Sequence, residues 1–491
     1  MEQKDPAPRV TTLEVAKGGR GGRRRAAYDR DWTQGNIARN VLLLAWPMVA
    51  GSIVNQFDMI VDMVWVARLG VRSVAGVAVA GNLVQVLNSA RMGLTTGQRA
   101  MVSRAVGADD IEAANYSTAQ AFLLNLVYVT LTIVAGVILA EPLMRLMGVE
   151  AEVARQGANY MRIMMFSQAA MSFRTMGDAA MQSSGDSMTP AKIITVIRGL
   201  HIILAPFLIF GWGFLPRLEV SGAALANTIT QILGAAIAIW VLASGHTRLR
   251  MKLTWRFNLS IIWEMIRIGF PASINSAERS IARAFITRIL ATFGTYGVAA
   301  HSIAARVDHL AELMSQGMGQ AAGVLVGQNL GAGRPDRSYR SAWTAMGFGA
   351  LASLIMGIGV VWKAEAIVRI FNSDPELVRM TSTYVRIMSA SFVFMCGSTV
   401  FSQALNGAGD TIPPMVVSIA SLWGVDLPLA YVIPRITGWG VYGIAVAAVA
   451  ASTVRVILYI CFFQWGKWKE KKIRIGRGEQ VVSAGHGGRI G

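Results

Sequence analysis

The chain has 491 residues, of which 53% are hydrophobic and 15% charged, and its mean hydropathy is +0.46. This is not the composition of an ordinary soluble domain. The formal net charge of +18 suggests nucleic-acid binding until the charges are placed along the chain. The two cysteines lie in apolar segments, which excludes a disulfide framework.

The first 40 residues are polar, and residues 18–25 read GGRGGRRR. A secretory signal peptide needs an apolar core, which this segment lacks. We interpret residues 1–40 as a disordered basic tail in the cytoplasm that touches anionic lipid.

Apolar stretches follow along the rest of the chain. Uncharged runs such as 117–140 and 341–362 exceed the roughly 20 residues that a spanning helix needs. Allowing a few interior charges, we predict twelve spans that start near residues 41, 74, 117, 158, 188, 222, 260, 297, 341, 382, 413 and 438. The predicted fold is therefore an all-α polytopic membrane protein. It has an N-terminal six-helix lobe (41–245), a cytoplasmic linker (246–260), a C-terminal six-helix lobe (261–466) and a basic cytoplasmic tail (467–491).

Positive charge is distributed unevenly between the loops. With the N-terminus inside, 27 of the 46 lysines and arginines fall in the tails and loops on that side, and 9 fall on the opposite side. Cytoplasmic loops of membrane proteins carry an excess of lysine and arginine. We therefore expect both termini in the cytoplasm, and the net charge requires no nucleic-acid partner.

The chain consists of two homologous halves displaced by 224 residues. Residues 160–164 (YMRIM) recur as residues 384–388 (YVRIM). The same displacement links Pro47 to Pro271, Gly107 to Gly331, Glu141 to Glu365, Gly185 to Gly409 and Pro190 to Pro414. Because each half has six spans, the halves point the same way. Such parallel repeats are related by an axis along the membrane normal and enclose a polar cavity between them.

Two glycine turns recur in each half, around Gly107 or Gly331 and at Gly185 or Gly409. Glycine allows positive φ in such turns, and a following proline restarts the next helix. We interpret these residues as structural.

The first span contains Asp58 and Asp62, which lie four residues apart and therefore on one helical face. Two carboxylates this close in a low dielectric cannot both ionise cheaply. We expect one of them to hold a proton near neutral pH and to act in cation coupling. The alternative is a structural pair neutralised by an arginine such as Arg91, Arg198 or Arg283.

Other ionisable residues within the spans are further candidates. His201, in the middle of the fifth span, either titrates between pH 5 and 8 or is a satisfied buried histidine. Glu278 in the seventh span is either a second titrating site or half of an ion pair with a neighbouring arginine. Secondary cavity candidates are Gln56, Asn227, Arg283 and the stripe formed by Asp308, His309 and Glu312. No metal-ligand cluster is predicted.

Four passages resemble the multidrug and toxic compound extrusion (MATE) transporters, over roughly residues 37 to 466. They are Pro47 followed by residues 62–70 (DMVWVARLG), residues 326–334 (VGQNLGAGR), Gly409-Asp410-Thr411 with Pro414, and residues 208–211 (LIFG) followed by 222–224 (GAA). The resemblance implies twelve helices in two lobes and alternating access. It also implies export of organic molecules against an inward flow of protons or sodium ions.

The resemblance also bears on the site. Many bacterial members have an aspartate on the first helix, which matches Asp62, and an Asn, an Asp before Pro and a Thr on the fifth and sixth helices. This chain has His201, Ala205 and Asn227 at those three positions, and it gains Asp58. We infer that the second carboxylate has moved to the first helix and that His201 faces the pair. Sodium prefers several oxygen ligands, so the exchange of an oxygen group for a nitrogen favours protons.

We therefore predict a secondary active antiporter, without cofactor, that exports organic, cationic and amphipathic compounds in exchange for protons or, as the alternative, sodium. Its partners are a small-molecule substrate and the lipid bilayer, and we expect a monomer in a bacterial inner membrane. A flippase or an exporter of a lipid-linked or anionic substrate remains the rival interpretation because several arginines lie within spans. An intramembrane enzyme is not predicted, since no nucleophile with its base is apparent.

Overall fold

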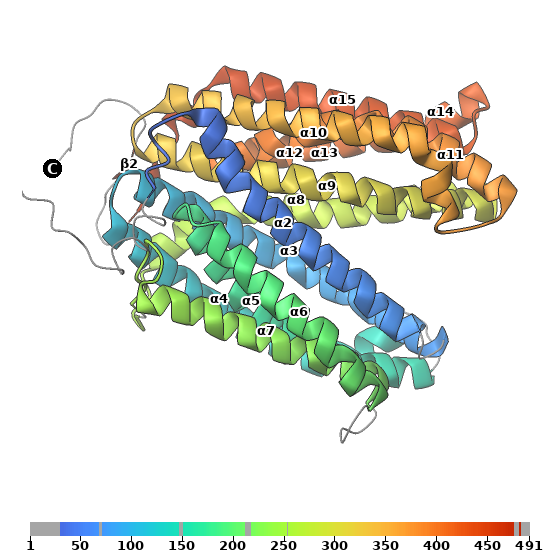
Figure 1. Cartoon of the computed structure of the whole chain (residues 1–491), viewed down its shortest axis with the longest axis horizontal. Coiled ribbons are helices and arrows are strands. Elements are labelled where there is room, and N and C mark those ends of the chain that lie inside the picture. Colours follow the sequence, from blue (N-terminus) through green and yellow to red (C-terminus); the bar gives the residue numbers. More distant parts are fainter. Residues whose placement is uncertain are drawn as a thin grey trace, which may run out of the picture.

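The computed structural model describes residues 30–67, 71–146, 151–211, 218–252, 254–475 and 481–482. Long helices run side by side in two groups (Figure 1). The N-lobe comprises α2 (Ile37–Ala67), α3 (Val71–Gly107), α4 (Ile111–Leu146), α5 (Ala151–Ser183), α6 (Met188–Phe210) and α7 (Glu219–Ser244).

The C-lobe repeats this order. It comprises α8 (Leu259–Ala291), α9 (Gly294–Gly331), α10 (Pro335–Arg369), α11 (Pro375–Ser389) with α12 (Ser391–Ala408), α13 (Ile412–Ser421) with the π-helical turn η1 (Leu422–Asp426) and α14 (Leu427–Thr437), and α15 (Val441–Trp465). The chain then forms the short 3₁₀ helix η2 (Lys467–Glu470) and the strands β1 (Ile473–Arg474) and β2 (Val481–Val482), which pair antiparallel. Each lobe thus makes six passes, as predicted.

Length and composition identify most of these passes as membrane spans. Seven helical stretches of the described chain could cross a bilayer on these grounds, and α11 with α12, bent by 45°, adds an eighth if taken as one span. The other long helices are α3, α5, α8 and α9, of which α3 and α9 have 37 and 38 residues. At 1.5 Å per residue, both exceed the hydrocarbon thickness of about 30 Å.

The outward faces of the helices are apolar. Large hydrophobic side chains that are more than half exposed lie on α4, α7 and α10, among them Leu131, Ile138, Trp240, Ile355 and Ile358. Exposed apolar surface on this scale indicates an apolar surrounding rather than water.

The two lobes are related by the 224-residue repeat, helix for helix. Gly107 and Gly331 end α3 and α9, and these helices cross there at close range. A Cβ atom at Gly107 would clash with the backbone of Gln328, and one at Gly331 would clash with the backbone of Arg104. Gln328 is the repeat equivalent of Arg104, so the contact is reciprocal, as a pseudo-twofold axis between the lobes requires.

The glycine turns differ in part from the prediction. Gly185 and Gly409 have positive φ (98° and 80°), as expected. In the other turn the positive φ occurs two residues after the first glycine, at Asp109 (58°) and at Gly333 (68°). Gly107 itself is required for the close helix crossing rather than for its φ angle.

Both terminal segments contact the same end of the molecule, here called the terminal end, where α2 begins and α15 ends. Residues 30–40 are ordered there, although the sequence suggested disorder up to residue 40, and α2 begins at Ile37. Trp32 is buried against Gly185 of the N-lobe. Arg334 of the C-lobe donates a hydrogen bond to the carbonyl oxygen of Thr33 (2.7 Å). The segment thus contacts both lobes.

The C-terminal segment crosses from the C-lobe to the N-lobe. Trp468 is buried and stacks on Phe463 with ring centroids 4.6 Å apart. Ile473 and Ile475 are buried in a hydrophobic cluster built mainly from α3, α4, α5 and the start of α8. Arg104 of α3 donates to the carbonyl oxygen of Lys471 (3.0 Å). Away from this end the lobes diverge (Figure 1).

Candidate functional site

Helices α2 and α6 bring three ionisable side chains into contact inside the N-lobe. Asp58, Arg198 and His201 are 3%, 7% and 2% exposed. Arg198 donates from Nη1 to Oδ2 of Asp58 (2.9 Å), and Nδ1 of His201 lies 2.7 Å from Oδ1 of the same carboxylate. Arg198 and His201 are three residues apart on α6, so both reach the face that packs on α2. Asp58 is therefore held by two partners.

Asp62 lies one helical turn beyond Asp58 and is held differently. Its Oδ1 atom is buried and has no hydrogen-bond partner among the described residues. The charges of His201, Asp58 and Arg198 act on it, in that order of size. A buried carboxylate oxygen without a donor needs a proton or a cation to satisfy it.

Several other buried polar atoms of the N-lobe are also unsatisfied in the described structure, and two of them belong to residues that the sequence had pointed to. Within the described part of the chain, Nε2 of His201 and Oδ1 of Asn227 on α7 are buried without a hydrogen-bond partner. Since Nδ1 of His201 faces Asp58, Nε2 is the ring atom left to accept or give a proton. The structure thus brings Asp58 and His201 into contact and places Asp62 within electrostatic reach of both.

Of the three arginines proposed to neutralise Asp58, the structure shows one in contact with it. Arg198 is the partner, whereas Arg91 donates to Oγ1 of Thr175 on α5 (2.9 Å). Arg283 belongs to α8, but its side chain lies outside the described residues.

A second buried ion pair was missed by the sequence analysis. Arg174 donates to Asp178, four residues later on α5, and its Nε donates to Oε1 of Gln231 on α7 (3.0 Å). Both members of the pair are buried. The opposite charges at four-residue spacing inside a span were the available signal.

The C-lobe has its own buried acid, Glu278 on α8, which is 6% exposed. Ser418 of α13 donates to its Oε2 (3.3 Å), and the charge of Arg455 on α15 acts on it more strongly than that of Arg279. Arg455 also donates to Ser421 (2.8 Å), the last residue before the π-helical turn. The sequence analysis did not identify Arg455 as a partner of Glu278. Whether Glu278 titrates stays a prediction.

Gln56 and the α9 stripe form a contact between the lobes. Nε2 of His309 lies 3.0 Å from Oε1 of Gln56, and Nδ1 lies 3.3 Å from Oε2 of Glu312. Asp308 lies within electrostatic reach of Glu312. Gln56 therefore lies at the lobe interface, whereas Asp308 interacts with Glu312 and Tyr384 within the C-lobe. No group of three or more His, Cys, Asp or Glu side chains suited to a metal ion occurs among the described residues.

Comparison with known proteins identifies relatives over most of the chain. A family model described as MatE matches residues 47–207 and 271–432. The chain is 25% identical over 451 residues to the probable multidrug resistance protein NorM of Thermotoga maritima, covering 89% of this chain and 94% of that protein. It is 27% identical over 411 residues to the multidrug resistance protein NorM of Burkholderia vietnamiensis, covering 82% and 88%. It is 24% identical over 402 residues to the FAD transporter of Shewanella oneidensis, covering 80% and 87%.

Solved structures share the fold. A MOP superfamily transporter from Pyrococcus furiosus superposes with a TM-score of 0.82 at 21% identity, covering 89% of this chain and 96% of that chain. A MATE transporter crystallised in complex with MaL6 gives a TM-score of 0.83 at 21% identity, covering 89% and 97%.

Proposed function

The chain belongs to the MatE family, whose members are transporters and not enzymes, and we propose that it exports organic compounds in exchange for protons. It is a multi-pass membrane transporter with two six-helix lobes. The two NorM relatives, named for multidrug resistance, support export as its direction. Alternating access, in which the lobes rock about a site between them, is the mechanism that two parallel repeats support.

The observation that carries proton coupling is the buried Oδ1 atom of Asp62, which has no hydrogen-bond partner among the described residues. Arg198 forms an ion pair with Asp58, so of the two acids on α2 it is Asp62 that is left to gain and lose a proton. The repeat equivalents of Asp58 and Asp62 are Ala282 and Ile286. The acids therefore break the symmetry of the fold, as expected of a function confined to one lobe.

In this proposal His201 relays the coupling proton within the site that it forms with Asp58 and Asp62. Its Nδ1 lies against Asp58, which orients the ring, and its Nε2, without a hydrogen-bond partner in the described part of the chain, is the atom left to exchange a proton. His201 contributes a nitrogen where sodium would prefer an oxygen, and Arg198 already engages the carboxylate of Asp58. Few oxygen ligands are therefore left for sodium. These contacts support protons over sodium as the coupling ion.

The orientation of the protein in the membrane is inferred from the distribution of positive charge. The excess of lysine and arginine in the tails and in the loops on their side supports a cytoplasmic terminal end in a bacterial inner membrane. The lobes pack together at that end and diverge at the other (Figure 1). This arrangement is that of an outward-facing state.

The substrate class is an organic, amphipathic cation in this proposal. Arg174 and Arg198, two of the intramembrane arginines that suggested an anionic substrate, are each paired with an aspartate. The FAD transporter among the relatives makes an anionic substrate the second candidate.

The test is transport by the purified protein in liposomes. A pH gradient and a sodium gradient are imposed separately, and the movement of a fluorescent organic cation or of FAD is followed. We expect the pH gradient alone to drive the cation and Asp62→Asn to abolish this transport. Asp336→Asn, the same substitution at a carboxylate that is 91% exposed, is the matched control. Proton-driven transport that persists in Asp62→Asn would refute the coupling role.

A further inference from the structure

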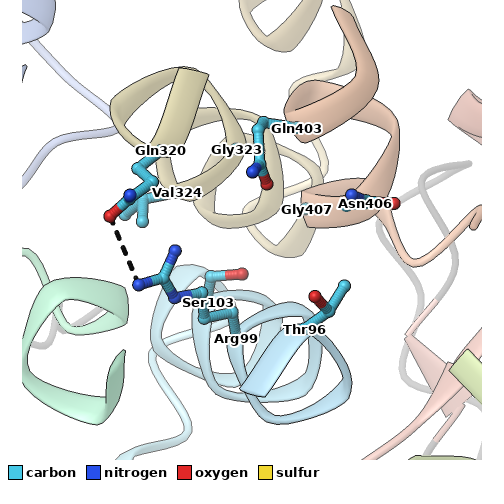
Figure 2. A pocket seen from close by; sticks show the side chains of 9 residues that line it. All are labelled: Thr96, Arg99, Ser103, Gln320, Gly323, Val324, Gln403, Asn406 and Gly407. Atoms are coloured by element: carbon cyan, nitrogen blue, oxygen red, sulfur yellow. Dashed lines mark hydrogen bonds between the residues drawn. The ribbon is translucent and has the colours of Figure 1, made fainter. Parts of the chain in front are cut away.

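A small polar cavity lies between the lobes, where α3 meets α9 and α12 (Figure 2). Its volume is about 20 Å³. The polar side chains that line it are Thr96, Arg99 and Ser103 of the N-lobe and Gln320, Gln403 and Asn406 of the C-lobe. This cavity is separate from the Asp58 site, which lies between α2 and α6.

The cavity lies at the pseudo-twofold axis. Ser103 and Gly327 are repeat equivalents, and a Cβ atom at Gly327 would clash with the hydroxyl of Ser103, so the two positions touch each other. Residues near a twofold axis meet their own equivalents in this way. A ligand in the cavity would therefore contact both lobes.

The residues of the two halves differ at the cavity. In the N-lobe, Nη2 of Arg99 donates to Oε1 of Gln182 (2.8 Å). The equivalents of these residues in the C-lobe are Gly323 and Asn406, both of which line the cavity. The Oδ1 atom of Asn406 has no hydrogen-bond partner among the described residues. One half thus has a guanidinium where the other half has a glycine that packs closely on the backbone of Gln403.

Arg99 brings a positive charge that makes no hydrogen bond to a carboxylate among the described residues. Its two hydrogen bonds reach the uncharged amides of Gln182 and Gln320 (2.8 and 3.3 Å). Its Nε atom is buried without a partner in the described structure, and the lining residues include no carboxylate. The acid whose charge acts on Arg99 is Asp178, which already accepts a hydrogen bond from Arg174. A charge inside a protein is normally paired.

We propose that this cavity binds a small monovalent anion of halide size, which is chloride under physiological conditions. The guanidinium of Arg99 supplies the charge and unused N–H donors. The amides of Gln403 and Asn406 line the cavity from the other lobe. Nε2 of Gln403 makes one long hydrogen bond to Gln316 (3.5 Å) and keeps a second N–H, and the Asn406 amide presents Nδ2 once it is rotated. A volume of about 20 Å³ holds one or two water-sized particles.

The anion couples to the conformational cycle because its site is divided between the lobes. Arg99 belongs to α3, and the amide donors belong to α9 and α12. The site exists only while the lobes are packed together at the terminal end. By linkage, an anion that binds this state alone shifts the equilibrium toward it.

The first experiment locates the ion. The full-length protein is crystallised in bromide in place of chloride, and anomalous scattering is recorded. We expect a bromide peak within hydrogen-bond distance of the Arg99 guanidinium in the wild type and none at that position in Arg99→Gln. Ordinary water at the site in the wild type, or a bromide peak that persists in Arg99→Gln, would overturn the proposal.

The second experiment measures the conformational effect without substrate or gradient, so its result does not depend on proton coupling. Spin labels are attached at the repeat-equivalent positions Arg145→Cys and Arg369→Cys, after Cys396→Ala and Cys461→Ser. Replacing gluconate by chloride is expected to increase the population with widely separated labels. Arg99→Gln should raise the chloride concentration that gives the half-maximal effect roughly tenfold or more.

Two variants control this measurement. Arg91→Gln removes another buried arginine from the same helix without touching the cavity and should keep the chloride dependence. Arg99→Lys preserves the charge and should restore part of the dependence if Arg99→Gln is poorly folded. A chloride dependence equal in wild type and Arg99→Gln, or lost equally in Arg91→Gln, would refute the site.

Discussion

The Nδ1 atom of His201 lies 2.7 Å from the Oδ1 atom of Asp58, across the contact between α6 and α2. The other oxygen of this carboxylate accepts a hydrogen bond from Arg198. Both oxygens of Asp58 are therefore engaged, whereas Asp62, one turn away, retains an oxygen without a partner in the described structure. The two acids on α2 are expected to respond differently to substitution.

Asp62→Asn should abolish proton-driven export while leaving thermal stability close to that of the wild type. The amide is isosteric with the carboxylate, and Asp62 forms no ion pair with the residues that the structure describes. Transport in liposomes and a thermal unfolding curve of the same preparation measure the two effects. A large loss of stability would instead assign a structural role to Asp62.

Asp58→Asn should destabilise the protein. The substitution leaves the buried Arg198 charge without its partner, and breaking a buried ion pair in this way costs about 3–5 kcal/mol. Thermal unfolding of Asp58→Asn, Arg198→Gln and the double variant gives a double-mutant cycle. We expect the double variant to be less destabilised than the sum of the single variants. Additive losses would mean that the pair contributes nothing as a pair.

Gly107→Ala should disrupt the packing of the lobes at the terminal end. The added methyl group would meet the backbone of Gln328, which cannot move as a flexible side chain could. We expect lower thermal stability and a smaller separation of labels at positions 145 and 369. Gly359→Ala in α10 is the matched control, since a Cβ atom there meets nothing within 4 Å. That control should gain about 0.5–1 kcal/mol of helix stability.

The cap of α11 should lose its effect in acid. Hydrogen bonds from the backbone N–H groups of Leu377 and Glu376 hold the pKa of Asp374 below its ordinary value of 3.8. A lowered pKa in the folded state means that the stabilisation is present above the unfolded-state pKa and is lost as pH falls through the folded-state pKa.

The comparison of Asp374→Ala with Asp374→Asn tests this cap. Asp374→Ala should lower the melting temperature at neutral pH, and the difference from wild type should shrink below about pH 4. Asp374→Asn can still cap the helix and should show a smaller loss. A difference for Asp374→Ala that does not change with pH would contradict the charged cap.

The repeat made the lobes predictable, because a displacement of 224 residues carries Gly107 onto Gly331 and Pro190 onto Pro414. The acids of α2 were also predictable, since ionisable groups in apolar spans are costly. The arginine that pairs with Asp58 could not be predicted. Choosing Arg198 over Arg91 or Arg283 requires the rotation of each helix about its own axis, which an apolar pattern interrupted by few charges leaves open.

Other features depended on contacts between distant segments. Ser103 and Gly327 are unremarkable residues whose meeting on the axis follows only from the packing of α3 on α9. The cavity beside them is lined by Arg99 and by its glycine equivalent, Gly323. That difference is readable in an alignment of the two halves only when their spatial contact is known.

The position of Ile473 and Ile475 has a consequence for synthesis of the protein. Both residues complete a hydrophobic cluster that is otherwise built mainly from the first half of the chain. They leave the ribosome only after every helix of the second half has been made. The first lobe can therefore insert early, but it cannot finish its core until translation is nearly over. A nascent chain stopped after Trp465 would present its defect to membrane proteases in the lobe that was synthesised first.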